Sequence, residues 1–190
     1  MKKLIFDTET AGLPSSWRAS ESDTSVWPRI VQIAWISLNE NNQATNSSAF
    51  IVKPEGFSIP IAASNIHGIT TERAYQEGIN LRQCMAEFAE DLSEADLLIA
   101  HNIDFDYPVV NCELRRLNMK TKLEKMSRFC TMKSTTNLCN IEGPYGPKWP
   151  KLEELYRHLF GRGFSGAHDA SQDVKACAEC YVHLKENQMI

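Results

Sequence analysis

The sequence has no apolar run long enough to cross a membrane, and none that would serve as the hydrophobic part of a signal peptide. Only three strongly apolar residues separate Met1-Lys2-Lys3 from Asp7, whereas a membrane-spanning helix needs about 20. Internal repeats and low-complexity segments are also missing. We therefore expect a cytoplasmic protein with no membrane contact. Its 190 residues, 43% of them hydrophobic, suffice for one substantial core and are few for two, so residues 1–190 are predicted to form a single domain.

The chain also lacks an excess of positive charge. Its formal net charge is −4, which argues against a broad basic surface that holds long nucleic acid. A pocket enzyme stays compatible with this charge, because a carboxylate-rich metal site makes its own surroundings negative until the ions bind. Net charge is therefore a poor guide to the substrate.

The cysteines form no pattern typical of a small disulfide-bonded domain. Six of them are scattered along the chain, so we expect reduced thiols. Cys177-Ala-Glu-Cys180 has CxxC spacing, but it lies in a helical pattern and no second such pair completes a zinc site. We interpret these two cysteines as core-facing.

What the sequence does contain is a pair of carboxylates inside an apolar strand near its start. Leu4-Ile5-Phe6 is typical of a buried strand, and Gly12-Leu13-Pro14 is a turn signal that ends it. Asp7 and Glu9 are two residues apart and therefore point to the same face of this strand. Like charges repel unless a cation lies between them, and carboxylates are usual ligands of Mg²⁺ or Mn²⁺. The alternative is an exposed edge strand with solvated carboxylates.

The rest of the chain reads as alternating strands, helices and loops. Periodicity and turn residues predict strands at 30–38, around 48–52, at 97–100 and at 128–132. Helices are expected at 81–94, from about Pro108 (in its first turn) onward, from the end of the 128–132 strand to about 140, at 152–159 and around 174–184. Loops are expected at 66–72 and 142–147. Ser15 to Pro28 is a long polar loop that carries Trp17 and Trp27. These tryptophans either cover the edge of the core or stack on an unpaired base.

Three acidic motifs follow one another along the chain. They are Phe6-Asp7-Thr8-Glu9-Thr10-Ala11-Gly12-Leu13, His101-Asn102-Ile103-Asp104-Phe105-Asp106 and His168-Asp169-Ala170-Ser171-Gln172-Asp173. In order and separation this set resembles the three motifs of the DEDDh 3′-to-5′ exonuclease family, and the resemblance extends over nearly the whole chain. It implies an α/β fold of the ribonuclease H-like type, with a mixed five-stranded sheet flanked by helices. Three strands are expected to be antiparallel and the others parallel.

The resemblance also implies a site and a reaction. Asp7, Glu9, Asp106 and Asp173 would bind two Mg²⁺ or Mn²⁺ ions, and His168 would be the general base. Two such ions stabilise the attacking and the leaving oxygen of an in-line displacement at phosphorus, and a histidine can accept a proton from water near neutral pH. The implied product is a nucleoside 5′-monophosphate released from the 3′ end.

Further residues are assigned to the substrate by the same resemblance. Thr10 and Leu13 would line the pocket of the terminal nucleotide, with Leu13 between the last two bases; ordinary turn packing is the alternative for Leu13. For His67, substrate contact is preferred to metal binding. Phe105 either packs or stacks on a base.

Two neighbouring carboxylates are rejected as ligands. The family pattern places the ligand after Phe105, which leaves Asp104 solvated. Asp169 lies four residues before Asp173 and could share its helix face, but it also has the position of a helix N-cap, so we interpret it as structural. We expect His101 and Asn102 to support the loop that carries Asp106.

The sequence thus predicts a metal-dependent 3′-to-5′ exonuclease acting on single-stranded or frayed DNA, as in proofreading or repair. An exoribonuclease of the ribonuclease T type is the nearest rival, and a non-catalytic nucleic-acid-binding or polymerase-associated module is a second. A related nuclease that cuts internally fits less well, because the third motif contains His168. The expected partners are 3′ ends of single-stranded DNA or RNA, with a DNA polymerase as a further candidate. The sequence does not indicate whether DNA or RNA is preferred, what the oligomeric state is, or whether the enzyme acts alone or as a polymerase subunit.

Overall fold

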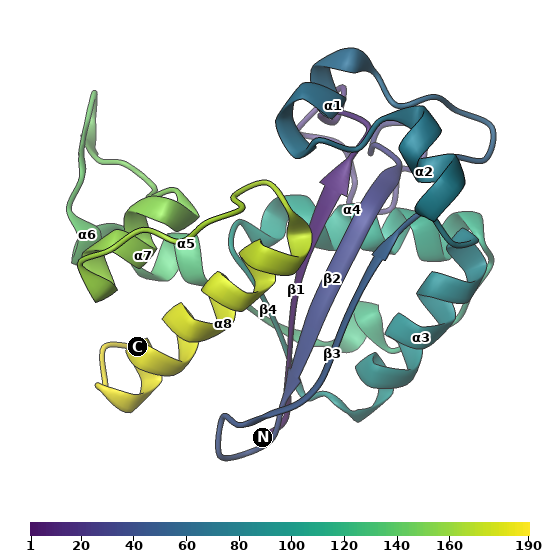
Figure 1. Cartoon of the computed structure of the whole chain (residues 1–190). Coiled ribbons are helices and arrows are strands. Elements are labelled where there is room, and N and C mark those ends of the chain that lie inside the picture. The colour runs from purple at the N-terminus through teal and green to yellow at the C-terminus, as the bar shows by residue number, and fades with distance from the viewer.

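The centre of the molecule is a mixed five-stranded sheet, seen in a computed structural model that describes residues 1–190 (Figure 1). The strands lie in the order β3-β2-β1-β4-β5. Strand β2 pairs antiparallel with β1 and β3, whereas β4 pairs parallel with β1 and β5. The expected arrangement of three antiparallel strands followed by parallel ones is confirmed. The bounds are β1 (Lys3–Thr10), β2 (Ile30–Leu38), β3 (Ala44–Ile51), β4 (Leu97–Ala100) and β5 (Ser127–Cys130).

Helices cover both faces of this sheet. They are α1 (Ile61–His67), α2 (Thr71–Glu77), α3 (Leu81–Glu94), α4 (Ile103–Arg116), α5 (Thr131–Ser134), α6 (Thr136–Cys139), α7 (Leu152–Phe160) and α8 (Ala170–Glu186), with a 3₁₀ turn at Leu123–Lys125 and a small hairpin of β6 (Glu142–Gly143) and β7 (Gly146–Pro147). Helices α3 and α4 lie on one face, and α8 lies on the other (Figure 1). None of these helices is long and apolar enough to span a bilayer.

The alternation of side chains along β1 decides what each face of the sheet receives. Leu4 and Phe6 belong to the core shared with α3 and α4, whereas Ile5 belongs to the core under α8. Because strand side chains alternate, the next odd-numbered residues, Asp7 and Glu9, point to the α8 side as well. The apolar first half of β1 therefore anchors the strand, and its second half presents two carboxylates towards α8.

Most predicted elements are confirmed, several with the expected bounds, as for β2, α3 and β4. The expected loop at 66–72 is wrong, because α1 continues to His67 and α2 begins at Thr71. Gly68 ends α1 in the left-handed conformation (φ 72°), and the Thr70 side chain caps α2 by accepting from the amide of Arg73. The sequence of this junction predicted a loop, because neither helix is long enough to show a period of 3.6 residues and the capping residues Gly68 and Thr70 are also typical of turns.

The start of α4 also differs from the prediction. The helix begins at Ile103, so Asp106 lies within it and Pro108 is an interior residue rather than part of the first turn. A proline usually marks a helix start, since it has no N–H to donate. Here Asn102, in the left-handed conformation (φ 74°), makes the turn from β4 into the helix, and the proline signal placed the boundary too late.

The two cysteines of the CxxC pair are confirmed as core-facing. Cys177 and Cys180 are 2% and 0% exposed, and all six cysteines are free thiols. They contribute to packing on two sides of α8.

Candidate active site

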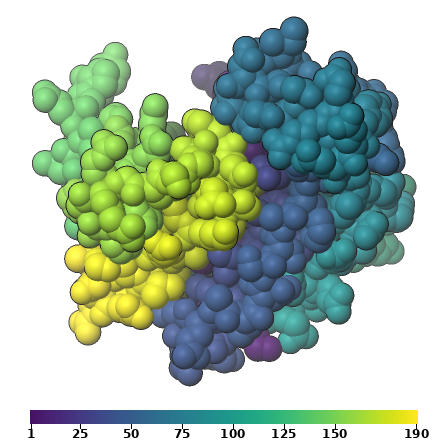
Figure 2. Space-filling model, in the orientation of Figure 1, coloured from purple at the N-terminus to yellow at the C-terminus, as the bar shows by residue number.

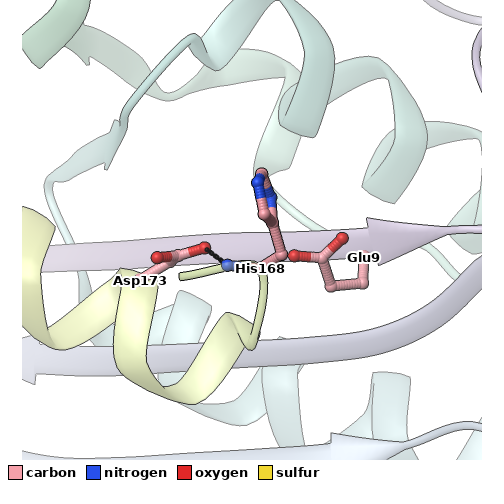
Figure 3. A group of neighbouring side chains, drawn as sticks. All are labelled: Glu9, His168 and Asp173. Atoms are coloured by element: carbon pink, nitrogen blue, oxygen red, sulfur yellow. Dashed lines mark hydrogen bonds between the residues drawn. The ribbon is translucent and has the colours of Figure 1, made fainter. Parts of the chain in front are cut away.

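The end of β1 and the start of α8 bring three of the predicted residues together. Glu9 comes from β1, whereas His168 and Asp173 come from the loop before α8 and its first turn (Figure 3). One potential ligand atom from each of these three side chains lies within 4.8 Å of the others. Asp7 lies two residues before Glu9 and faces the same side of the sheet.

The approach to α8 is held by hydrogen bonds that position Asp173. The backbone amide of His168 donates to Oδ2 of Asp173 at 2.9 Å (Figure 3). His168 has a positive φ of 67°, a conformation that β-carbon-bearing residues adopt only where their surroundings require it. Asp169 caps the helix by accepting from the amide of Ser171 at 2.8 Å. This turn therefore aims the amide of His168 at the next carboxylate in the helix.

Asp106 reaches the site from the other face of the sheet. It is 3% exposed, and its Oδ1 accepts from both the amide and the hydroxyl of Thr8, at 3.0 and 2.7 Å. Thr8 lies between the two carboxylates of β1 and points to the α4 side. Thr8 of β1 thus orients the carboxylate of Asp106 from α4, while Asp7 and Glu9 on either side of Thr8 provide carboxylates of their own.

A cavity of about 570 Å³ is lined by all four predicted ligands and by His168. Besides Asp7, Glu9, Asp106, Asp173 and His168, its lining includes Thr8, His101, Asn102, Phe105, Met132, Trp149, Pro150, Lys151, Leu152, Glu153, Phe164 and Ala167. In Figure 2 a notch at the top of the molecule separates atoms around residues 55–75 from those around residues 125–150; Met132, Trp149 and Pro150 of the second group line the cavity, and none of the first group does. The residues of the three motifs therefore surround one space.

The clustering of these carboxyl groups has a marked electrostatic consequence. Burial, together with the negative charges of Asp173 and Asp106, raises the pKa of Glu9 to about 8. Burial also raises the pKa of Asp173 to about 6, against the stabilising amide of His168. The pKa values of Asp7 and Asp106 are likewise raised, mainly by burial, and in Asp106 the hydrogen bonds from Thr8 oppose the rise. The site holds negative charge that bound protons or cations must neutralise.

This donor set fits a hard divalent cation. Carboxylate oxygens are the preferred ligands of Mg²⁺ and Mn²⁺, and oxygens of Glu9 and Asp173 lie within 4.8 Å of each other, with a ring nitrogen of His168 equally near. The raised pKa values point the same way, because a cation would stabilise the charged form of carboxyl groups that burial and neighbouring carboxylates disfavour.

The residues predicted to contact the substrate lie in different surroundings. Phe105 lines the cavity and packs against Trp17 and Trp27, with ring centroids 5.9 and 6.5 Å away. Thr10 is buried, and its hydroxyl donates to the carbonyl of Gly12 at 2.6 Å. Leu13 is 74% exposed, so turn packing does not account for it. Thr10 and Leu13 are not among the cavity-lining residues, and their contact with a nucleotide stays a prediction.

His67 is buried at the end of α1 and does not line the cavity. Its Nδ1 accepts from the amide of Ile69 at 3.1 Å, while its Nε2 is buried without a partner. Burial lowers the pKa of His67, which favours the neutral ring. Its predicted substrate contact also stays a prediction.

The rejected carboxylates have the structural surroundings that were expected. Asp104 is exposed and forms an ion pair with Lys133, and Asp169 is the N-cap of α8. His101, which we expected to support the loop that carries Asp106, joins this loop to α5 and to the segment before α7, because its ring lies 3.0 Å from Thr131 Oγ1 and 2.9 Å from the carbonyl of Pro150. Burial lowers its pKa to about 4, so this ring is neutral at physiological pH.

Sequence reasoning missed the part of the cavity that comes from residues 132–164. Met132, Trp149 and Phe164 line it, but they belong to no motif and to three separate segments. The one available signal was Trp149, a large aromatic residue in a stretch rich in glycine and proline.

Comparison with known proteins assigns the family. The model of the RNase_T family, described as exonuclease, matches residues 4–181. The chain belongs to this family, which confirms the resemblance of its three motifs to DEDDh exonucleases. Members of the family are typically metal-dependent 3′-to-5′ exonucleases.

Individual relatives are distant. The DNA polymerase III subunit epsilon of Haemophilus influenzae is 24% identical over 188 residues, which cover 98% of this chain and 68% of the relative. The same subunit from Buchnera aphidicola subsp. Acyrthosiphon pisum is 27% identical over 187 residues, or 98% of this chain and 74% of the relative. Among solved structures, E. coli exonuclease I in a complex with single-stranded DNA is similar with a TM-score of 0.79 and 22% identity.

The likeness to exonuclease I confirms the predicted fold class, a ribonuclease H-like mixed sheet flanked by helices. It covers 99% of this chain but only 41% of the exonuclease I chain. This chain therefore spans about two fifths of that protein.

Proposed function

We propose that this protein is a metal-dependent exonuclease that removes nucleotides from the 3′ end of single-stranded or frayed DNA and releases nucleoside 5′-monophosphates. The observation that carries the proposal is the meeting of Asp7, Glu9, Asp106, Asp173 and His168 around one cavity. Holding four carboxyl groups there costs folding free energy, since their pKa values are raised by burial and mutual repulsion. A module that only bound nucleic acid would gain nothing from that cost.

The four carboxylates would hold two Mg²⁺ or Mn²⁺ ions. When bound, such ions supply charge neutralisation at the attacking oxygen, the leaving oxygen and the phosphate between them. The chain's own contribution is geometric: Thr8 fixes the oxygen of Asp106, and the amide of His168 fixes that of Asp173. Two of the ligands are therefore oriented before substrate arrives.

His168 is the proposed general base. Its imidazole lies at the rim formed by the loop before α8, beside Glu9 and Asp173. From there it would take a proton from the attacking water and hold it at a ring nitrogen while the phosphodiester bond breaks.

DNA is preferred to RNA as the substrate because of the relatives. The curated relatives are subunits of a DNA polymerase, and the similar solved structure is a complex with single-stranded DNA. We further propose that residues 1–190 work as a single exonuclease domain. The same relatives make a DNA polymerase a second candidate partner.

The test is digestion of 5′-labelled DNA and RNA single strands of the same sequence, with Mg²⁺ or Mn²⁺. We expect a ladder that shortens from the 3′ end, faster on DNA, and that disappears with EDTA or in Asp7→Ala. His168→Asn should lower kcat by roughly 10²- to 10⁴-fold, because asparagine tolerates the positive φ but accepts no proton at neutral pH.

The matched control is Asp104→Asn, which changes an exposed carboxylate outside the cavity lining and should keep the wild-type kcat. Faster digestion of RNA would replace the DNA assignment with the exoribonuclease one. If folded, metal-loaded protein cleaves neither strand but binds them, the non-catalytic module becomes the better account.

A further inference from the structure

A second cleft of about 570 Å³ opens beside the catalytic cavity. Three of the four tryptophans of the chain line it, namely Trp17, Trp27 and Trp149. The two spaces share Asn102, Met132 and Trp149 in their linings. The cleft therefore adjoins the candidate active site.

The tryptophans differ in what they do for the fold. Trp27 is 4% exposed and belongs to the main core, and its indole N–H donates to the carbonyl of Ser20 at 2.9 Å. Trp17 and Trp149 are 57% and 60% exposed. Trp27 thus fits the interpretation that it covers the core edge, but core packing does not explain two large aromatic side chains left open on one cleft.

The loop that carries Trp17 is fastened to α4. Arg116 donates from Nη2 to the carbonyls of Thr24 and Trp27, at 2.6 and 2.7 Å, and Asn111 donates to the carbonyl of Glu21 at 3.1 Å. Arg116 also pairs with the fully buried Glu113 at 3.2 Å. Although it contains no helix or strand, the loop holds the exposed ring on a defined backbone.

The opposite side of the cleft is fastened as well. The carbonyl of Pro150, next to Trp149, lies 2.9 Å from Nε2 of His101. The amide of Lys148 donates to the carbonyl of Ile141 at 2.9 Å, which closes the hairpin segment. His101 itself lines the catalytic cavity, so Trp149 is joined to the active site through one side chain.

The acidic groups of the cleft are neutralised by partners. Arg128 donates to both carboxylate oxygens of Glu21, at 2.8 and 3.0 Å, and Lys133 pairs with Asp104. The ammonium of Lys133 also lies 5.9 Å from the centre of the Trp149 ring. Flat apolar surfaces with nearby cations suit an aromatic ligand that is attached to phosphates.

We propose that Trp17 and Trp149 form a stacking site for an unpaired base of the strand whose phosphodiester bond lies in the catalytic cavity. The inference rests on the proposed function, because it takes the occupant of the adjoining cavity to be a single strand. Stacking needs only the face of a base, so the site would be tolerant of sequence. A base that is paired within a duplex does not offer its face, so this cleft would favour single-stranded or frayed ends.

The experiment is a cycle that combines side-chain removal with base removal. Single strands that carry one abasic residue at each of the last four positions are compared with the intact strand, using wild type, Trp17→Ala and Trp149→Ala. Both kcat/KM with Mg²⁺ and the dissociation constant in EDTA, from the anisotropy of a 5′ fluorescent label, are measured. Trp17→Phe, which keeps an aromatic face, and Tyr75→Ala, which removes an exposed ring on α2, are the controls.

At one of the four positions, the abasic residue should lower the kcat/KM of the wild type and raise its dissociation constant, each roughly tenfold. On the intact strand, Trp17→Ala and Trp149→Ala should show losses of similar size, and the abasic residue should then have little further effect on either variant. Trp17→Phe should retain it, and Tyr75→Ala should match the wild type. Independent effects of base removal and tryptophan removal at all four positions, in both measurements, would overturn the stacking site. If the wild type still digests the intact strand, that result leaves the exonuclease proposal intact. Conversely, if base removal and tryptophan removal are coupled in the dissociation constant but no strand is digested, the stacking site is retained and the exonuclease proposal is rejected.

Discussion

Thr8 donates two hydrogen bonds to one oxygen of Asp106, from its backbone amide at 3.0 Å and from its hydroxyl at 2.7 Å. The contact joins β1 to α4 across 98 residues of sequence and fixes a carboxylate that is 3% exposed. Because Thr8 stands between Asp7 and Glu9, the backbone that presents two predicted ligands also orients a third. The three carboxylates are therefore coupled mechanically as well as electrostatically.

Thr8→Val tests this coupling, since valine has nearly the same shape but no hydroxyl. We expect a loss of about 1–2 kcal/mol in the free energy of unfolding, because a buried carboxylate loses a donor. The Mg²⁺ concentration for half-maximal activity should rise, because Asp106 is less firmly oriented. Thr135→Val is the matched control: its buried hydroxyl donates to the carbonyl of Thr131 at 2.7 Å, away from the carboxylates. An unchanged metal requirement in Thr8→Val would contradict the orienting role.

Asp106 and its neighbour Asp104 provide a comparison within one helix. Asp106→Asn removes the negative charge but keeps an oxygen for Thr8, so we expect the protein to fold and hydrolysis to fall by at least about 100-fold. Asp104→Asn breaks only an exposed ion pair with Lys133 and should change the free energy of unfolding by less than about 1 kcal/mol. Steady-state hydrolysis and urea unfolding of both variants check the assignment. Equal losses of activity in the two variants would contradict the rejection of Asp104 as a ligand.

Asp169 next to His168 is predicted to act through helix capping alone. It accepts from the amide of Ser171 at 2.8 Å and from Nε2 of Gln32 at 3.3 Å. Asp169→Ala should cost about 1 kcal/mol of the free energy of unfolding, whereas Asp169→Asn, an equally good cap, should keep both stability and turnover. Thermal unfolding and kcat measured side by side distinguish the roles, since a metal ligand would lose turnover in the asparagine variant too.

The strongest sequence predictions came from local rules that the fold does not override. Period two in a strand put Asp7 and Glu9 on one face, and the structure has them on the α8 side of β1. Capping chemistry identified Asp169 correctly. Proline misplaced the start of α4, because Asn102 in a left-handed conformation made the turn that proline was expected to mark. Helices α1 and α2, which end at and follow His67, were too short for their sequences to show helical periodicity.

The cleft of Trp17 and Trp149 lay beyond such rules. Its walls come from segments more than 100 residues apart, and no spacing connects them. The sequence showed that Trp17 occupies a long loop, and the choice between core packing and base stacking was left open. The structure separates the two tryptophans of that loop by exposure, 57% for Trp17 against 4% for Trp27. Tertiary contacts from α4, through Arg116 and Asn111, decide where the loop lies.

The raised pKa values predict how the stability of the metal-free protein depends on pH. Unfolded carboxyl groups titrate near pH ~4, whereas the pKa is about 8 for Glu9 and about 6 for Asp173 in the folded protein. Between these values the folded state binds more protons than the unfolded state, so the free energy of unfolding falls as pH rises and levels off above the folded pKa values. Mg²⁺ binds the deprotonated groups, so its stabilising effect should grow over the same range.

Thermal unfolding in EDTA and in saturating Mg²⁺, from pH 5 to 8, measures both effects. We expect the two melting temperatures to be similar at pH 5 and to separate at pH 8, with the EDTA sample less stable. Glu9→Gln is the control, because it removes the group whose pKa is about 8 and keeps the shape of the side chain. Its metal-free melting temperature should depend less steeply on pH between 6 and 8 than that of the wild type. Equal slopes for Glu9→Gln and wild type would mean that other groups cause the dependence, and that Glu9 titrates as an ordinary surface carboxylate.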